Sequence, residues 1–123
     1  LTNFLRDIRE DFDELGRVYM PEDELARFGL EPVDLRRKVY DQRFVDFMKF
    51  QIERNKQVYR EAFPAIKLLR WRGRLAVKIS YVLYKAIFGE IERADYNVYR
   101  ERVRTGFRQK IRLSLLALAG VYE

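Results

Sequence analysis

Three oxygen-bearing side chains are spaced four residues apart at the start of the sequence: Asn3, Asp7 and Asp11. A helix places residues four apart on one face, so the three side chains would form a row. The two aspartates repel each other in such a row unless a positive charge lies between them. Mg²⁺ takes oxygen ligands, often one or two carboxylates together with substrate phosphates. The spacing therefore indicates a site for Mg²⁺ and a diphosphate, and the competing interpretation is an acidic helix face exposed to solvent.

The composition restricts the chemistry open to this chain of 123 residues. It has no cysteine and no histidine, which excludes disulfides, thiolate metal sites and catalytic groups built on histidine. Residues 1–34 hold 4 basic and 10 acidic side chains, whereas residues 35–123 hold 21 basic and 9 acidic ones. The acidic part suits cations, and the basic part suits phosphates, nucleic acid or anionic lipid.

The elements that must position these side chains are expected to be helices. Apolar residues recur at helical spacing along most of the chain, and Phe44, Met48 and Ile52 are one such series. Pro64 is expected to break the longest helix. The helical segments that we expect are residues 1–14, 22–28, 33–39, 41–63, 64–69, 74–94 and 107–119, with a turn over residues 70–73. The prediction is an all-α domain, an antiparallel helical array without a sheet.

A second cluster combines cations with an aromatic ring. Trp71 is surrounded in the sequence by Lys67, Arg70, Arg72 and Arg74. Aromatic residues among cations occur at RNA-binding and membrane-binding surfaces, but the turn between two helices is also an ordinary solvated place for charge. The sequence contains no run of 18 apolar residues, so it predicts no transmembrane helix. We expect a cytoplasmic location, with peripheral contact at a membrane surface left open.

Several motifs closely resemble those of the squalene/phytoene synthase family. The sequence Asn-Phe-Leu-Arg-Asp-Ile-Arg-Glu-Asp at residues 3–11, with the segments 16–21 and 23–30 after it, is similar to the second aspartate-rich motif of the family and its following loop. Less specific similarity continues in family order through residues 59–62, 72–76, 84–91 and 96–99. The resemblance covers nearly the whole chain.

This resemblance implies an isoprenoid synthase type fold and a prenyltransferase activity. The reaction of the family is the head-to-head condensation of two molecules of farnesyl or geranylgeranyl diphosphate, with Mg²⁺ as cofactor. Its products are squalene, dehydrosqualene or phytoene, which belong to terpenoid and carotenoid biosynthesis. The substrate chain length is left open.

The resemblance also implies roles for individual residues. The metal ligands would be Asn3, Asp7 and Asp11, and the two aspartates would be catalytic. Arg6 would contact the diphosphate. Arg102 would bind substrate, although Arg100 is close enough to take its place. Tyr84 would face the reaction centre as a catalytic and substrate-binding residue, and its alternative is an ordinary core tyrosine. Arg17 and Tyr19 lie in the matched loop, where either could be structural.

The sequence departs from the family in one important respect. It contains a single pair of aspartates with the spacing Asp-x-x-x-Asp, whereas the family has two such motifs that face each other. We therefore expect residues 1–123 to be the C-terminal half of a synthase domain and to be inactive alone. The alternative function is a non-catalytic helical module that binds polyanions, either nucleic acid or an anionic membrane surface. The synthase interpretation expects no nucleic-acid partner.

Overall fold

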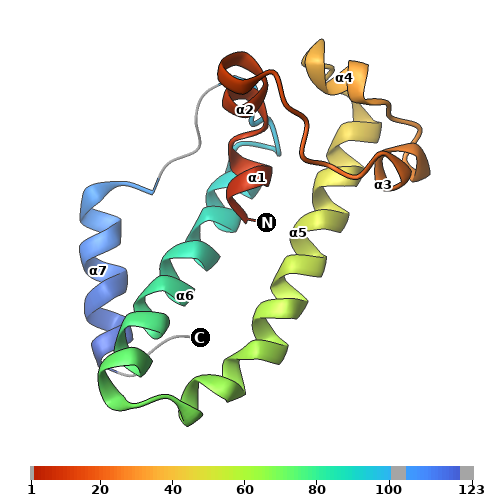
Figure 1. Ribbon diagram of the computed structural model, residues 1–123. Helices are drawn as coiled ribbons and strands as arrows, with labels where there is room; N and C mark the ends of the chain where they lie inside the picture. Colours follow the sequence, from red (N-terminus) through yellow and green to blue (C-terminus); the bar gives the residue numbers. More distant parts are fainter. Residues whose placement is uncertain (1, 101–104, 120–123) are drawn as a thin grey trace.

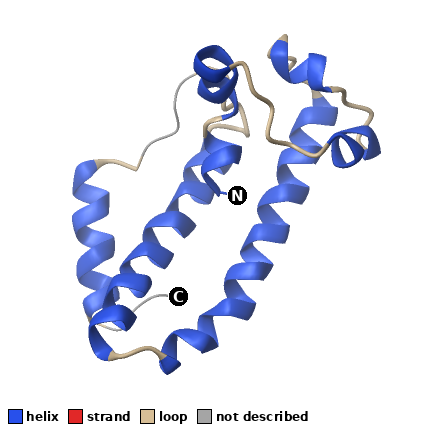
Figure 2. Cartoon of the chain, viewed as in Figure 1, coloured by secondary structure: helices blue, strands red, loops and turns tan. Residues whose placement is uncertain are grey.

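The computed structural model describes residues 2–100 and 105–119, and these residues form helices and loops without any strand (Figure 2). The elements are α1 (Thr2–Arg6), α2 (Ile8–Leu15), α3 (Glu22–Arg27), α4 (Pro32–Arg36), α5 (Gln42–Ala62), the 3₁₀ helix η1 (Phe63–Leu68), α6 (Trp71–Arg93) and α7 (Phe107–Leu118). The long helices α5 and α6 are antiparallel, α1 contacts both of them, and α7 packs along α6 (Figure 1). The all-α prediction is confirmed.

Local sequence signals determine both ends of α5. The carboxylate of Asp41 accepts a hydrogen bond from the backbone N–H of Phe44 (3.2 Å), which is the usual capping interaction at a helix N-terminus. Phe44, Met48 and Ile52 are buried, as their spacing predicts. The α-helix ends at Ala62, and Pro64 lies in η1, so the expected break at this proline is confirmed.

The first predicted helix is interrupted, because Asp7 separates α1 from α2. The expectation of one continuous helix over residues 1–14 was therefore wrong. The backbone N–H of Asp7 still bonds to the carbonyl of Asn3, and that of Asp11 to the carbonyl of Asp7, both at 2.8 Å. Side chains four residues apart consequently stay on successive turns across the break. Gly16 ends α2 in the left-handed conformation (φ 63°), which is common for a glycine directly after a helix.

The turn between η1 and α6 is shorter than predicted. Trp71 already belongs to α6, whereas we expected a turn over residues 70–73. Gly73 therefore lies in the first turn of α6 and not in the connecting turn. Nη2 of Arg74 donates to the carbonyls of Lys67 (2.8 Å) and Leu69 (3.0 Å), which ties the end of η1 to the start of α6.

Two hydrophobic clusters stabilise the fold. The larger joins α1 and α2 to α3–α6, and the smaller joins η1 and α6 to α7. Leu5 of α1 and Ile8 of α2 are both buried in the larger cluster. The buried residues of α6 lie mainly in its second half and include Val82, Ile87 and Ile91, whereas Leu75 and Ile79 nearer its start are half-buried. None of the described helices is long and apolar enough to cross a membrane.

Candidate active site

The predicted acidic row lies where α1 meets α2, near the upper part of the molecule in Figure 1. Asn3 is on α1, Asp7 is at the junction, and Asp11 is on α2. Asn3 is exposed, and the two aspartates are half-buried. The backbone hydrogen bonds across the junction keep the three residues on consecutive turns. The structure therefore keeps the three residues on consecutive turns, and their joint role as metal ligands stays a prediction.

Arg6 binds the first aspartate of the row. Its Nε and Nη2 atoms donate to the two carboxylate oxygens of Asp7 at 2.7 and 2.5 Å, which is the bidentate geometry of a strong charge-assisted pair. The pKa of Arg6 is raised, first by this hydrogen bond to Asp7 and further by the charges of Asp7 and Glu10 and by Tyr84. The arginine thus stays charged beside the carboxylates and within electrostatic reach of Tyr84.

The second aspartate of the row is in an environment that disfavours its negative charge. Burial raises the pKa of Asp11, and the neighbouring charges of Asp7 and Glu10 raise it further, while Arg6 opposes them. A bound cation would relieve this repulsion, because an opposite charge nearby favours the ionised carboxylate. The electrostatics of the row therefore suit a cation.

The oxygen atoms of the row suit a hard divalent ion whose remaining coordination positions are filled by water or phosphate. The row offers two carboxylates and one amide oxygen on consecutive turns. Within residues 2–100 and 105–119, no group of three or more Asp, Glu, His or Cys residues could enclose a metal ion. Mg²⁺ is typically bound by one or two carboxylates plus waters and substrate phosphates rather than by a complete protein cage. The residues present thus fit such an ion together with a phosphate ligand.

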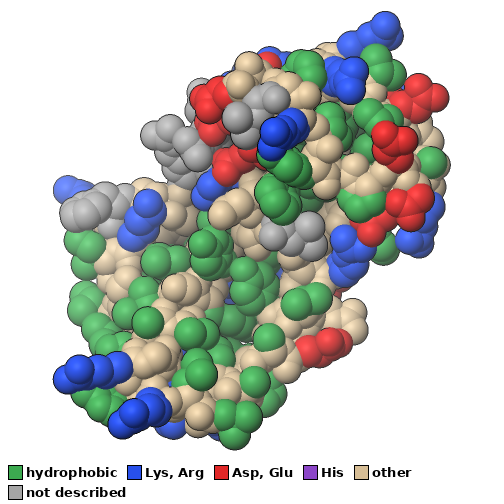
Figure 3. Space-filling view, viewed as in Figure 1, with side chains coloured by type: hydrophobic (Ala, Val, Ile, Leu, Met, Phe, Trp, Pro, Cys, Tyr) green, Lys and Arg blue, Asp and Glu red, His purple; other side chains and the backbone are tan. Residues whose placement is uncertain are grey.

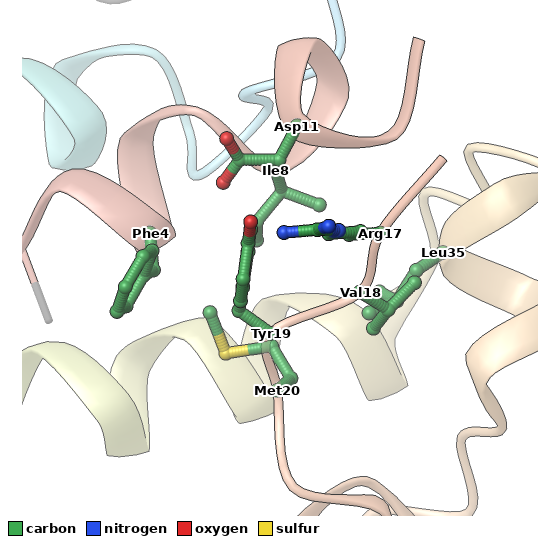
Figure 4. Close-up of a pocket in the computed structure, with 8 residues that line it drawn as sticks. All are labelled: Phe4, Ile8, Asp11, Arg17, Val18, Tyr19, Met20 and Leu35. Carbon is green, nitrogen blue, oxygen red and sulfur yellow. The ribbon is translucent and has the colours of Figure 1, made fainter. Parts of the chain in front are cut away.

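The loop after α2 folds back against the row. Tyr19 stacks on Phe4 of α1, with ring centroids 4.9 Å apart and an interplanar angle of 21°. Asp11, Arg17 and Tyr19 line one small cavity of about 10 Å³, which is room for about one water molecule (Figure 4). The structure therefore brings Arg17 and Tyr19, which the sequence left without an assigned role, next to the second aspartate.

A larger apolar pocket of about 470 Å³ lies between α5, η1 and α6. Its lining combines aromatic, aliphatic and small residues: Tyr59, Ala62, Phe63, Ala65, Ile66, Leu69, Val77, Ser80, Tyr81 and Tyr84. This volume is in the usual range for small-molecule sites. Tyr84 is 39% exposed, so it is a wall of this pocket rather than the ordinary core tyrosine that was its alternative.

Tyr59 connects the acidic row to the apolar pocket. The hydroxyl of Tyr59 lies 3.2 Å from the hydroxyl of Thr2 on α1, the residue before Asn3. Tyr59 and Tyr84 both line the pocket. Sequence reasoning missed the role of Tyr59, although its place in a motif of the family was a usable signal. The polar row and the apolar pocket are therefore neighbouring parts of one site.

Two further arginines bear on the predicted site. Arg102, the predicted substrate-binding residue, lies outside the described residues. Nη1 of Arg9 donates to the backbone carbonyls of Tyr99 (3.2 Å) and Arg100 (3.3 Å), so it joins α2 to the segment after α6.

A comparison with known families identifies the chain. The sequence profile described as squalene/phytoene synthase matches residues 1–115. The chain belongs to the squalene/phytoene synthase family. The resemblance deduced from the residues is thus confirmed, and it includes the segment that forms the acidic row.

Curated relatives agree with this assignment. Phytoene synthase 1, chloroplastic, of Zea mays is 41% identical over 122 residues, which are 99% of this chain and 28% of the relative. The 15-cis-phytoene synthase of Synechococcus elongatus is 40% identical over 102 residues, which are 83% of this chain and 33% of the relative. The chain therefore spans about a third or less of the length of the relatives that it matches.

A solved structure supports the fold. The crystal structure of a dehydrosqualene synthase in complex with ligand superposes with a TM-score of 0.83 at 22% sequence identity, over 98% of this chain and 42% of that chain. This member of the squalene/phytoene synthase family thus has the all-α fold of isoprenoid synthases.

Proposed function

We propose that this chain forms part of the active site of a prenyltransferase that condenses two prenyl diphosphates head to head. One observation carries the proposal. A row of carboxylates with a bidentate arginine lies beside a 470 Å³ apolar pocket, and Tyr59 connects the two. A prenyl diphosphate has the same two parts, a charged head and a long apolar tail. The match between the two halves of the site and the two halves of the substrate supports this class of ligand.

The names of the relatives favour the longer substrate. The relatives at 40–41% identity are called phytoene synthases. We therefore propose geranylgeranyl diphosphate as the substrate and phytoene as the product, with farnesyl diphosphate and C30 products as the second choice. None of the comparisons favours the alternative of a non-catalytic polyanion-binding module.

The residues of the polar row would bind and orient the diphosphate. Mg²⁺, when held by Asn3, Asp7 and Asp11, would supply the positive charge that helps a diphosphate to leave. Arg6 remains protonated and presents N–H donors beside the same position. Donors aimed at the point where negative charge develops are an effective way to lower a reaction barrier.

The residues of the apolar pocket would protect the cationic hydrocarbon that ionisation leaves. Aromatic rings line the pocket at Tyr59, Phe63, Tyr81 and Tyr84. Ring faces attract positive charge, and an apolar wall keeps water away from a reactive cation. Tyr84 lines this pocket, and in this proposal it would face the cation beside the diphosphate end.

We also propose that residues 1–123 correspond to the C-terminal half of the synthase domain. The chain covers 28% of the maize relative and contains one Asp-x-x-x-Asp pair. A second diphosphate needs a further set of ligands, which a facing part of the domain would provide.

The test is binding of a non-hydrolysable geranylgeranyl diphosphate analogue, measured by titration calorimetry with and without Mg²⁺. We expect Mg²⁺-dependent binding that falls about tenfold or more in Asp7→Asn and in Asp11→Asn, because each loses a charge-assisted contact. Asp13→Asn is the matched control, since Asp13 is an exposed carboxylate on α2 that pairs with Lys38. If the double variant of Asp7 and Asp11 binds the analogue as tightly as the parent chain, the site assignment is wrong.

A further inference from the structure

The turn from η1 into α6 presents two large apolar side chains to solvent. Leu68 is 88% exposed and Trp71 is 69% exposed. They alternate with the cations Lys67, Arg70 and Arg72. We propose that this turn, which we call the basic tip, docks the protein on the surface of an anionic phospholipid bilayer. Leu68 and Trp71 would enter the interface, and the cations would contact lipid phosphates.

The charge of the surrounding surface is suited to such a partner. Residues 62–89 contain six Lys or Arg residues and no Asp or Glu. Residues 105–118 contain three Lys or Arg residues and likewise no Asp or Glu. In the view of Figure 3 the acidic side chains lie in the upper and right parts of the molecule, while the lower left part shows cations and apolar groups. Among the described residues, no ion pair joins Lys67, Arg70 or Arg72 to a carboxylate. Their charge is therefore available to an anionic surface.

Helix α7 extends the apolar part of the same end. Ala117 packs in one cluster with Ile66 of η1, which brings the C-terminal end of α7 close to the basic tip (Figure 1). Leu115 and Leu118 are exposed there. Basic helices with apolar residues on one side, and tryptophan in particular, are typical of segments that lie in the bilayer interface.

The side chains of the basic tip favour lipid over RNA. The guanidinium of Arg72 lies 5.1 Å from the centroid of the Trp71 ring and covers one of its faces. An RNA-binding surface would use that face to stack a base. Leu68 has no ring to stack on a base. Transfer of an exposed leucine side chain from water into hydrocarbon is favourable.

Docking here would also place the apolar pocket next to the bilayer. Leu69 lines the pocket and lies directly after Leu68. A long isoprenoid could pass between the pocket and the lipid without crossing water, a consequence that rests on the proposed function. The docking itself requires no prenyl substrate, so its test and the test of the proposed function are independent.

The experiment measures binding of the whole chain to vesicles by sedimentation and by fluorescence. Trp71 is the only tryptophan in the sequence, so its emission reports directly on the basic tip. We expect binding and a blue shift with vesicles of phosphatidylcholine mixed with phosphatidylglycerol, and neither with phosphatidylcholine alone. Leu68→Ser should weaken binding about tenfold. Lys67→Glu combined with Arg72→Glu should weaken it more, since each basic residue near the surface contributes about fivefold.

Arg36→Glu combined with Arg37→Glu is the matched control, because it makes the same change of net charge on exposed residues of α4. Far-ultraviolet circular dichroism verifies that each variant is folded. Equal loss of binding in the control pair would overturn the proposal, because net charge alone would then explain the effect. Binding to single-stranded RNA that is tighter than binding to anionic vesicles, without a blue shift, would overturn it as well.

Discussion

Arg6 and Asp7 form a bidentate ion pair at the break between α1 and α2, with contacts of 2.7 and 2.5 Å between adjacent residues. Neighbouring side chains on a regular α-helix point about 100° apart and do not face each other. The backbone of Asp7 (φ −102°, ψ 14°) departs from helical values, which allows the two side chains to meet. The interruption of the helix and the arginine–carboxylate pair are thus one structural feature, located in the middle of the acidic row.

The first prediction concerns the geometry of this pair. Arg6→Lys keeps the positive charge but cannot donate two parallel hydrogen bonds to a carboxylate or a phosphate. We expect it to weaken Mg²⁺-dependent binding of the diphosphate analogue about tenfold, as measured by titration calorimetry. Arg37→Lys changes an exposed residue directly after α4 and should leave the affinity unchanged. Equal affinities for the parent chain and Arg6→Lys would show that charge alone is needed at this position.

The second prediction separates the apolar pocket from the polar row. Tyr84→Ala removes part of the pocket wall without touching a carboxylate. We expect the affinity for the geranylgeranyl analogue to fall about tenfold, because the tail loses apolar contact, and the affinity for inorganic pyrophosphate to stay the same. Val58→Ala, an exposed position on α5 outside the pocket, is the control. A parallel loss for both ligands would instead assign Tyr84 to the diphosphate end.

Part of the fold could be predicted because its signals are local. The start of α5 depends on Asp41 and its end on Pro64, and both act on the few residues beside them. The row of Asn3, Asp7 and Asp11 followed from spacing alone, since the hydrogen bonds between successive turns survive the break. Features of this kind are visible in a sequence without knowledge of the tertiary structure.

Other features depend on contacts between distant residues and could not be predicted. The break at Asp7 occurs together with the side-chain pair between Arg6 and Asp7, which a helical pattern does not reveal. The apolar pocket forms only because η1 turns the chain back, which places Tyr59 and Tyr84 around one space. Gln51 is polar yet fully buried, and its partner Glu24 is on α3, 27 residues earlier. Helical periodicity cannot indicate which distant residue such a side chain will meet.

The third prediction concerns this buried contact between α3 and α5. Nη1 of Arg54 donates to Glu24 at 2.5 Å, and Nε2 of Gln51 donates to the other carboxylate oxygen. The hydrogen bond from Arg54, followed by that from Gln51, lowers the pKa of Glu24 in spite of its burial. Because the pKa is lowered in the folded state, the stabilisation is complete above the unfolded pKa of about 4.3 and is lost as the pH falls through the folded value.

Glu24→Gln should therefore reduce the free energy of unfolding by about 1 kcal/mol at neutral pH. The difference from the parent chain should shrink in urea denaturation series at pH values below about 4. Glu22→Gln, an exposed change in the same first turn, should have a smaller effect, because it loses only the helix-dipole interaction that both positions share. A deficit for Glu24→Gln that is constant across the acid range would mean that the charge of Glu24 does not stabilise the fold.

The last prediction follows from the proposal that the chain is one half of a synthase domain. Head-to-head condensation must hold two diphosphates, while the chain offers one Asp-x-x-x-Asp pair and, over the residues that the structure describes, no enclosed group of metal ligands. The apolar pocket also has walls from α5, η1 and α6 alone, so a bound tail would remain open to water on one side. Ionisation under these conditions would favour hydrolysis over carbon–carbon bond formation.

We therefore expect the isolated chain with Mg²⁺ to bind geranylgeranyl diphosphate without forming phytoene, as measured by extraction and chromatography of the hydrocarbon products. Measurable phytoene from the chain alone, abolished by Asp7→Asn, would show that this half contains a complete active site.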